Sequence, residues 1–217
     1  MSGLSLRMAW RNLWRHSRRT WLTATAMIFS NVLLVFMISL QFGSYEMMIN
    51  NTLRSFSGHL QVQADGYNDN PKMRSSVPDI LPLTEQVRTA LPDADVAARA
   101  MAFALASSEQ RSFGVQIIGV QPAYERQVSS LPGLVNRGRF LHDDTVAEIV
   151  IGSVMARNLK VVLGDELTLL GSGRDGSFAA GVVRIVGIFE SGSADMDRSI
   201  AEVPLRYFQD SFAMGDH

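Results

Sequence analysis

The chain has 217 residues, a formal net charge of −1 and no cysteine. The lack of cysteine excludes disulfides, thiolate nucleophiles and zinc sites built on cysteine. Without the five arginines that precede residue 20, the 15 remaining basic side chains face 21 acidic ones. This mildly acidic remainder disfavours nucleic acid and an anionic membrane surface as ligands.

The first predicted element is an amphipathic helix over residues 1–20. Its tryptophans and leucines recur at helical spacing beside a stripe of arginines. This pattern is typical of a helix that lies along a membrane surface, with its guanidinium groups toward lipid phosphates. Ordinary basic flanking with chance periodicity is the alternative. The predicted interface residues are Arg7, Trp10, Arg11, Trp14, Arg15, Arg18, Arg19 and Trp21.

Residues 21–44 are predicted to form a transmembrane helix. No charged residue or histidine occurs between Arg19 and Glu46, and about 20 apolar helical residues cross a bilayer core. The run is longer than the apolar region of a signal peptide, and no small-x-small cleavage site follows it. The lack of any charge also disfavours the buried helix of a soluble protein. The arginines place the N-terminus in the cytoplasm and the bulk of the chain across the membrane.

Asn31 lies near the middle of this apolar run. A polar amide at that depth needs a hydrogen-bonding partner. We therefore expect Asn31 to pack against other transmembrane helices. The alternative is a single asparagine tolerated at modest cost.

Residues 45–217 are expected to form one region beyond the membrane. Its first half mixes helical periodicity with period-two alternation, which indicates half-buried strands. Gly58 is expected to end a helical stalk. The expected elements are the stalk at 45–56, a strand at 59–64, a loop at 65–82, a helix capped by Thr84, strands at 96–107 and 113–120 and a helix at 122–130.

The second half continues this mixture of hairpins and short helices. Pro204 places the last expected strand at a sheet edge. The predicted class is therefore α+β: one N-terminal transmembrane helix followed by a two-lobed mixed α/β domain. The expected elements are strands at 148–151, 166–170, 179–189 and 202–204, a hairpin tip at 171–177 and helices at 153–159 and 205–212.

The glycines at 171–176 match G-x-G-x-x-G, and Asp195 follows at a distance typical of a ribose-binding acid. An alternating β-branched run follows them instead of a helix, which favours a hairpin tip. Ser153 lacks the second glycine of a nucleophile elbow and is expected to cap its helix. Asp195, Asp197 and the cluster at 142–144 are interpreted as solvated loops. With no Walker A motif and no spaced histidine ligands, the sequence predicts no enzyme activity and no cofactor or metal site.

Five short segments of the chain form a recognisable series: residues 11–15, 57–62, 149–159, 163–169 and 186–192. Together these segments resemble MacB/FtsX-type ABC transporter permeases. Their order and spacing agree over nearly the whole chain, and the lipoprotein-releasing branch is the most similar. Macrolide and peptide exporters share the architecture.

The resemblance implies a first transmembrane helix and a periplasmic core domain at residues 45–217, in the bacterial inner membrane. It implies a homo- or heterodimer of permease subunits, driven by a separate cytoplasmic ATPase subunit that binds the ATP. Membrane lipid and a lipoprotein or periplasmic adaptor are the further partners implied. The family has three more helices, so we expect a fragment, a truncated product or half of a split permease.

Two other functions fit the same residues. A single-pass, membrane-anchored periplasmic sensor or assembly protein would need no ATPase and no further helices. A membrane-anchored periplasmic enzyme is disfavoured, because the sequence brings no nucleophile, metal or acid–base set together. The gene sequence downstream of residue 217 would separate the permease from the sensor.

Overall fold

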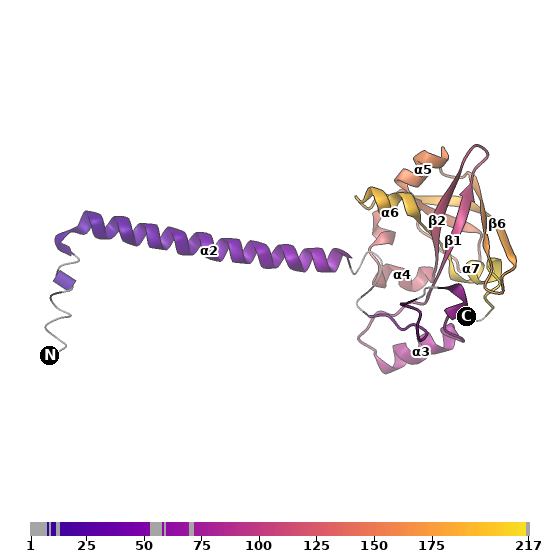
Figure 1. Cartoon of the computed structure of the whole chain (residues 1–217), viewed down its shortest axis with the longest axis horizontal. Helices are drawn as coiled ribbons and strands as arrows, with labels where there is room; N and C mark the ends of the chain where they lie inside the picture. The colour runs from indigo at the N-terminus through magenta and orange to yellow at the C-terminus, as the bar shows by residue number, and fades with distance from the viewer. Residues whose placement is uncertain are drawn as a thin grey trace. The chain divides into compact units, whose positions relative to one another are not determined.

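The computed structural model describes residues 8, 10, 11, 14–52, 58, 60–69 and 72–215. The chain forms two compact units, residues 1–52 and 53–217. The first unit contains α2 (Ser17–Thr52), whose 36 residues make it about 54 Å long (Figure 1). A turn at His16 precedes α2.

The described strands of the second unit form one mixed sheet. Their order is β3-β6-β4-β7-β2-β1-β5, and β5 also pairs with β6. Six strands therefore close into a ring, and β3 extends the sheet beyond β6. The pairs β2–β7 and β4–β6 are parallel. The strands are β1 (Arg99–Ser107), β2 (Ser112–Val120), β3 (Val135–Gly138), β4 (Glu148–Gly152), β5 (Glu166–Ser172), β6 (Phe178–Phe189) and β7 (Ile200–Pro204).

Short helices connect and cover these strands (Figure 1). α7 contacts β1, β2, β6 and β7, and α5 packs against α6. The helices of the second unit are η2 (Met73–Ser75), α3 (Ile80–Ala90), α4 (Pro122–Val128), η3 (Leu131–Leu134), α5 (Ser153–Leu159), α6 (Ala194–Ser199) and α7 (Leu205–Ser211).

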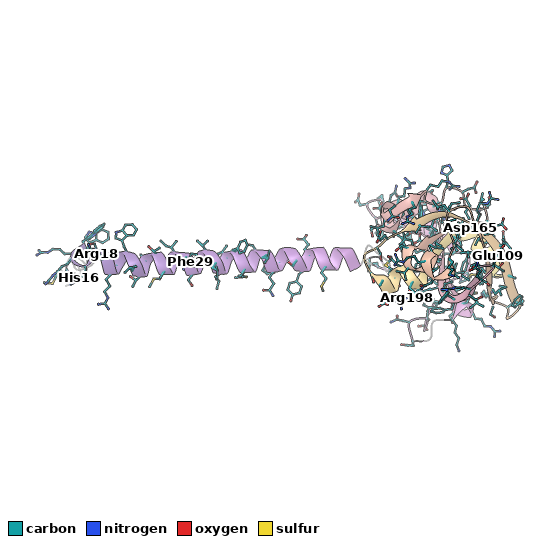
Figure 2. All side chains as sticks on the ribbon, turned by 90° about the horizontal axis from the view of Figure 1, so that it is seen from above. His16, Arg18, Phe29, Glu109, Asp165 and Arg198 are labelled. Carbon is teal, nitrogen blue, oxygen red and sulfur yellow. The ribbon has the colours of Figure 1, made fainter. Side chains whose placement is uncertain are left out.

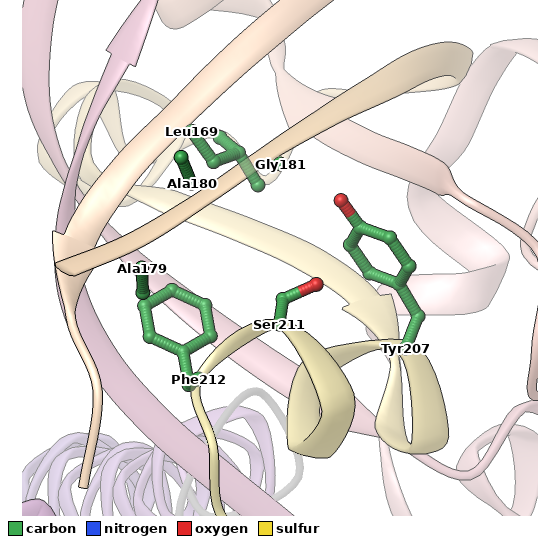
Figure 3. Close-up of a pocket in the computed structure, with 7 residues that line it drawn as sticks. All are labelled: Leu169, Ala179, Ala180, Gly181, Tyr207, Ser211 and Phe212. Carbon is green, nitrogen blue, oxygen red and sulfur yellow. The ribbon is translucent and has the colours of Figure 1, made fainter. Parts of the chain in front are cut away.

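Two clusters of buried apolar side chains hold the second unit together. The inner cluster joins the strands of the ring to α5 and α7, and the outer cluster joins β2, β4, β6 and β7 to η3. Figure 3 shows how closely α7 approaches the β5–β6 hairpin: the space between them has no room for a water molecule. At Gly181 a Cβ atom would lie 2.3 Å from the Tyr207 hydroxyl oxygen, so a larger residue there would require the Tyr207 side chain to move.

The α+β class with an N-terminal apolar helix is confirmed. Several elements were also predicted closely, because their signals are local. α5 has the predicted bounds, and the β5–β6 hairpin turns where the glycines are. The backbone N–H of Gly173 donates to the carbonyl of Ser177, as in a tight turn. A nucleotide-binding helix does not follow, so the hairpin interpretation holds.

Three expectations about individual elements were wrong. β7 is not an edge strand: it lies between β4 and β2, and Pro204 is tolerated because it is the last strand residue before α7. Residues 60–64 carry no strand. Thr84 does not cap a helix, because α3 begins at Ile80, and its hydroxyl instead donates to the Ile80 carbonyl at 2.6 Å.

The expected two lobes are not separate units, since residues 53–217 group together around the single sheet. Neither β3 nor α6 was predicted from the sequence. Both are short, and β3 depends on pairing with β6, a segment distant in the chain.

Candidate functional surfaces

The predicted interface residues lie partly before α2, as far as Arg15, and partly in its first turns, at Arg18, Arg19 and Trp21. Trp10 and Trp14 are helical and exposed, and their rings meet edge to face with centroids 6.4 Å apart. This is the geometry of side chains four positions apart on one helix face. Arg7 lies outside the described residues. Arg11, Arg15, Arg18, Arg19 and Trp21 are all helical and exposed. The interfacial role of these residues stays a prediction.

α2 carries a continuous apolar stretch. Ser17–Glu46 spans 30 residues, with a mean hydropathy of 2.0 over its most apolar window, none of which is buried in the structure. Phe29 illustrates the exposure: 67% of its surface is accessible (Figure 2). A helix of this length and composition can cross a hydrocarbon core of about 30 Å.

Asn31 bonds within its own helix. Its side-chain amide donates to the Met27 carbonyl at 3.0 Å. This bond lowers the cost of placing the amide in lipid, because one donor is already satisfied. The predicted packing of Asn31 against another helix stays a prediction.

Ser153 and Asp197 form a buried polar contact that the sequence analysis interpreted wrongly. Ser153 opens α5 without capping it, and its hydroxyl donates to Asp197 at 3.1 Å. Asp197 is buried, not solvated, and also accepts from the backbone N–H and the hydroxyl of Ser191. Gly152 permits the contact, since a Cβ there would lie 2.2 Å from the Asp197 carbonyl oxygen. These hydrogen bonds hold α6 against α5, so the role of Ser153 and Asp197 is structural.

A buried ion pair and a buried carboxyl lie on the outer side of the sheet. The Arg99 guanidinium binds both carboxylate oxygens of Glu125, which is fully buried. Glu202 aligns with Ile118 across β2 and β7, and directly paired strand residues face the same side. Its Oε2 is buried without a hydrogen-bond partner among the described residues.

The environment of Glu202 favours its protonated form. Burial, followed by repulsion from the Glu125 carboxylate, holds the pKa of Glu202 well above its ordinary value, and the attraction of Arg99 only partly offsets this. The sequence signal was available but unused: an acidic residue interrupts the apolar run from Ile200 to Val203.

A groove of about 550 Å³ lies beside the first half of β1. Its volume falls in the range of ligand-binding pockets. Apolar side chains dominate its walls, most of which come from α3, from residues 60–67 with 73–77, and from residues 94–101. The sequence analysis missed it, because the three walls are separated in the chain and no motif marks them. Among the described residues, no group of three potential metal ligands occurs in the groove or elsewhere.

A comparison with protein families identifies the class of protein to which the chain belongs. The model of the MacB-like periplasmic core domain matches residues 20–217, which include both α2 and the sheet domain. The chain therefore belongs to this family, and the resemblance to MacB/FtsX-type ABC transporter permeases is confirmed. With its apolar helix, it is a membrane protein with an extracytoplasmic domain.

Two solved structures are similar to parts of the chain. The extracellular domain of the noncanonic ABC-type transporter YknZ from Gram-positive bacteria is 21% identical, with a TM-score of 0.45, over 70% of this chain and 74% of that one. A domain of a Porphyromonas gingivalis protein predicted to be a permease is 17% identical, with a TM-score of 0.40, over 58% of this chain and 52% of that one. No curated protein matches the chain significantly in sequence.

Proposed function

We propose that this chain belongs to a permease subunit of an ABC transporter and that this subunit couples a cytoplasmic ATPase to substrate handling outside the membrane. The observation that carries the proposal is the family match over residues 20–217, which spans the apolar helix and the sheet domain together. Lipoprotein release or export is the proposed activity, and a second permease subunit is the proposed partner in the membrane.

The proposed topology places the N-terminus in the cytoplasm of a bacterial cell and residues 53–217 in the periplasm. Basic residues concentrate on the cytoplasmic side of membrane helices, and five arginines precede residue 20. The chain itself is proposed to catalyse no reaction and to bind no cofactor, with ATP bound by the partner ATPase.

Single-cysteine labelling tests the topology cleanly, because the natural chain has no cysteine and gives no background. His16→Cys reports the side before α2, and Gln110→Cys reports the exposed β1–β2 turn. With a membrane-impermeant maleimide on intact spheroplasts, we expect labelling of Gln110→Cys alone. Labelling of His16→Cys before lysis would overturn the topology.

Coupling is tested by purifying the tagged chain in lipid nanodiscs from cells that co-express the ABC ATPase encoded nearest to its gene. We expect the ATPase to elute with the chain and its ATP hydrolysis rate to change in the complex. If neither ATPase nor a second permease subunit is retained after cross-linking in the native membrane, the single-pass sensor becomes the better account.

A further inference from the structure

The groove beside β1 exposes a strand edge. β1 pairs with β2 along its whole length, but with β5 only from Ala104 to Ser107. On the side of β1 away from β2, no strand among the described residues pairs with the stretch before Ala104, and this stretch lines the groove as far as Met101. Residues 95–98, which precede β1 and also line the groove, belong to no strand.

The hairpin geometry shows where the backbone groups of Met101 point. The Ser108 N–H donates to the Arg111 carbonyl at the end of the β1–β2 hairpin. Hydrogen-bonded and non-hydrogen-bonded pairs alternate along an antiparallel ladder, and the register is unbroken. Met101 and Ile118 are therefore a non-hydrogen-bonded pair. The N–H and C=O of Met101 point away from β2, and no backbone hydrogen bond joins them to another described residue.

The neighbouring backbone is satisfied by side chains. Arg88 donates to the Val96 carbonyl at 2.7 Å, and the Ala98 N–H donates to Gln121 at 3.1 Å. An acyl chain in the groove would leave the polar groups of Met101 desolvated and unpaired, which is costly. A polypeptide strand would pair with them.

The residues that line the groove indicate which side chains a bound strand should carry. Only two charged side chains line the described groove, Asp95 and Arg99, and Arg99 is bound by Glu125. Asp95 therefore remains as a negative charge at one end. Leu60 and Val62, which also line the groove, are 91% and 66% exposed. The occupant should have apolar side chains at alternate positions and a basic group near Asp95.

We propose that the groove binds an extended polypeptide segment of a partner protein as an additional strand on the open edge of β1. The groove wall from residue 95 to residue 101 is roughly 20 Å long, which leaves room for six to seven residues of the added strand, and the backbone hydrogen bonds would form at Met101. Strand addition of this kind takes affinity from main-chain hydrogen bonds and specificity from pockets for alternate side chains. The proposal does not depend on coupling to an ATPase, so either can fail without the other.

Binding is measured with the full chain in lipid nanodiscs. The probe is a fluorescein-labelled peptide amide of sequence Lys-Val-Thr-Val-Thr-Val-Thr, and its anisotropy is compared with that in empty nanodiscs. A version N-methylated at every valine and threonine keeps the apolar side chains but removes the N–H donors. We expect saturable binding of the first peptide and at least about tenfold weaker binding of the second.

Two matched substitutions locate the site. Leu60→Asp places a charge on a highly exposed groove residue, so the fold is not threatened, and we expect about tenfold weaker binding. Val162→Asp makes the same kind of change at another exposed apolar residue, outside the groove. We expect it to bind the peptide as the natural chain does.

Hydrogen exchange provides a direct readout of the edge. The Met101 amide should exchange freely in the chain alone and become protected when the unmodified peptide binds. Equal binding of both peptides, displacement of the peptide by palmitate without Met101 protection, or a Met101 amide already protected in the free chain would each overturn the proposal. So would the absence of binding above empty nanodiscs, or equal effects of the two aspartate substitutions.

Discussion

The two units of this chain differ in how far their phenylalanine side chains are exposed. Phe29 on α2 is 67% exposed, whereas Phe189 and Phe208 in the sheet domain are fully buried. Burying a phenylalanine from water gains about 1.5–3 kcal/mol, and a soluble fold would not forgo this gain along a whole helix. This contrast is the one expected for a helix surrounded by lipid and a domain surrounded by water.

The largest expected effect comes from removing the same ring in each unit. Phe208→Ala should destabilise the sheet domain by about 3–5 kcal/mol, because Phe208 stacks on Phe212 at 4.6 Å and packs over Gly119. Amide hydrogen exchange of residues 53–217 in nanodiscs measures this loss. Phe29→Ala is the control and should leave that exchange unchanged; a comparable loss from both would remove the distinction between the units.

The second largest effect is expected from introducing a charged side chain into each unit. Leu33→Arg should cost about 2.5–3.5 kcal/mol in membrane insertion, as for arginine near the middle of a spanning helix. The measurement is the fraction of chain that resists alkaline extraction from membranes. Val182→Arg, at an exposed apolar site of the sheet domain, should be retained as the natural chain is. Full retention of Leu33→Arg would argue against a spanning α2.

The third prediction concerns pH and the buried carboxyl of Glu202. Because its pKa is raised by folding, chiefly through burial, the folded state holds its proton more tightly than the unfolded state. The resulting stability is fully present below the unfolded pKa and is lost as pH rises through the folded value. Glu202→Gln cannot ionise and should remove this loss.

Urea unfolding of the sheet domain at pH 5 and at pH 8 measures this effect. The variant should gain stability relative to the natural chain at pH 8 and gain less at pH 5. A gain that is the same at both values would show that Glu202 does not titrate in this range. Glu109→Gln, on an exposed turn, is the matched control and should change neither value appreciably.

The smallest expected effect tests Asn31. If its amide also serves a neighbouring helix, Asn31→Leu should weaken helix association by about 0.6 kcal/mol, the average for such bonds in membranes. Energy transfer between labelled chains in nanodiscs measures the association. Ser30→Leu makes a similar change on another face of α2. Equal effects of the two would assign Asn31 no special role.

Local signals made much of the fold predictable. The apolar run of α2 needs only composition, and α5 and the β5–β6 hairpin need only periodicity and glycines. The family resemblance also depended on short segments, one of which contains α5. The position of β7 needs more, because it is set by parallel pairing with β2, which comes much earlier in the chain. Pro204 suggested an edge, and this tertiary pairing overrode it.

The candidate surfaces were predictable only where they follow one helix. The tryptophan and arginine stripes before α2 come from helical spacing alone. The groove and the set of Arg99, Glu125 and Glu202 could not be found in this way, since each brings together distant segments. Ser153 and Asp197 show the same limit: both were interpreted by their immediate neighbours, and their contact depends on how α5 meets α6.

The course of β6 has a mechanical consequence. Arg184 aligns with Glu166 on β5 and with Glu148 on β4, so the strand passes from one partner to the other at this residue. Residues 178–184 hold β5, and residues 184–189 hold β4 and β3. A force that pulled β5 away from β4 would therefore act mainly on the backbone at Arg184. Separating residues 178–184 of β6 from β5 would open the ring of strands, while β3 and β4 stayed paired with the second half of β6.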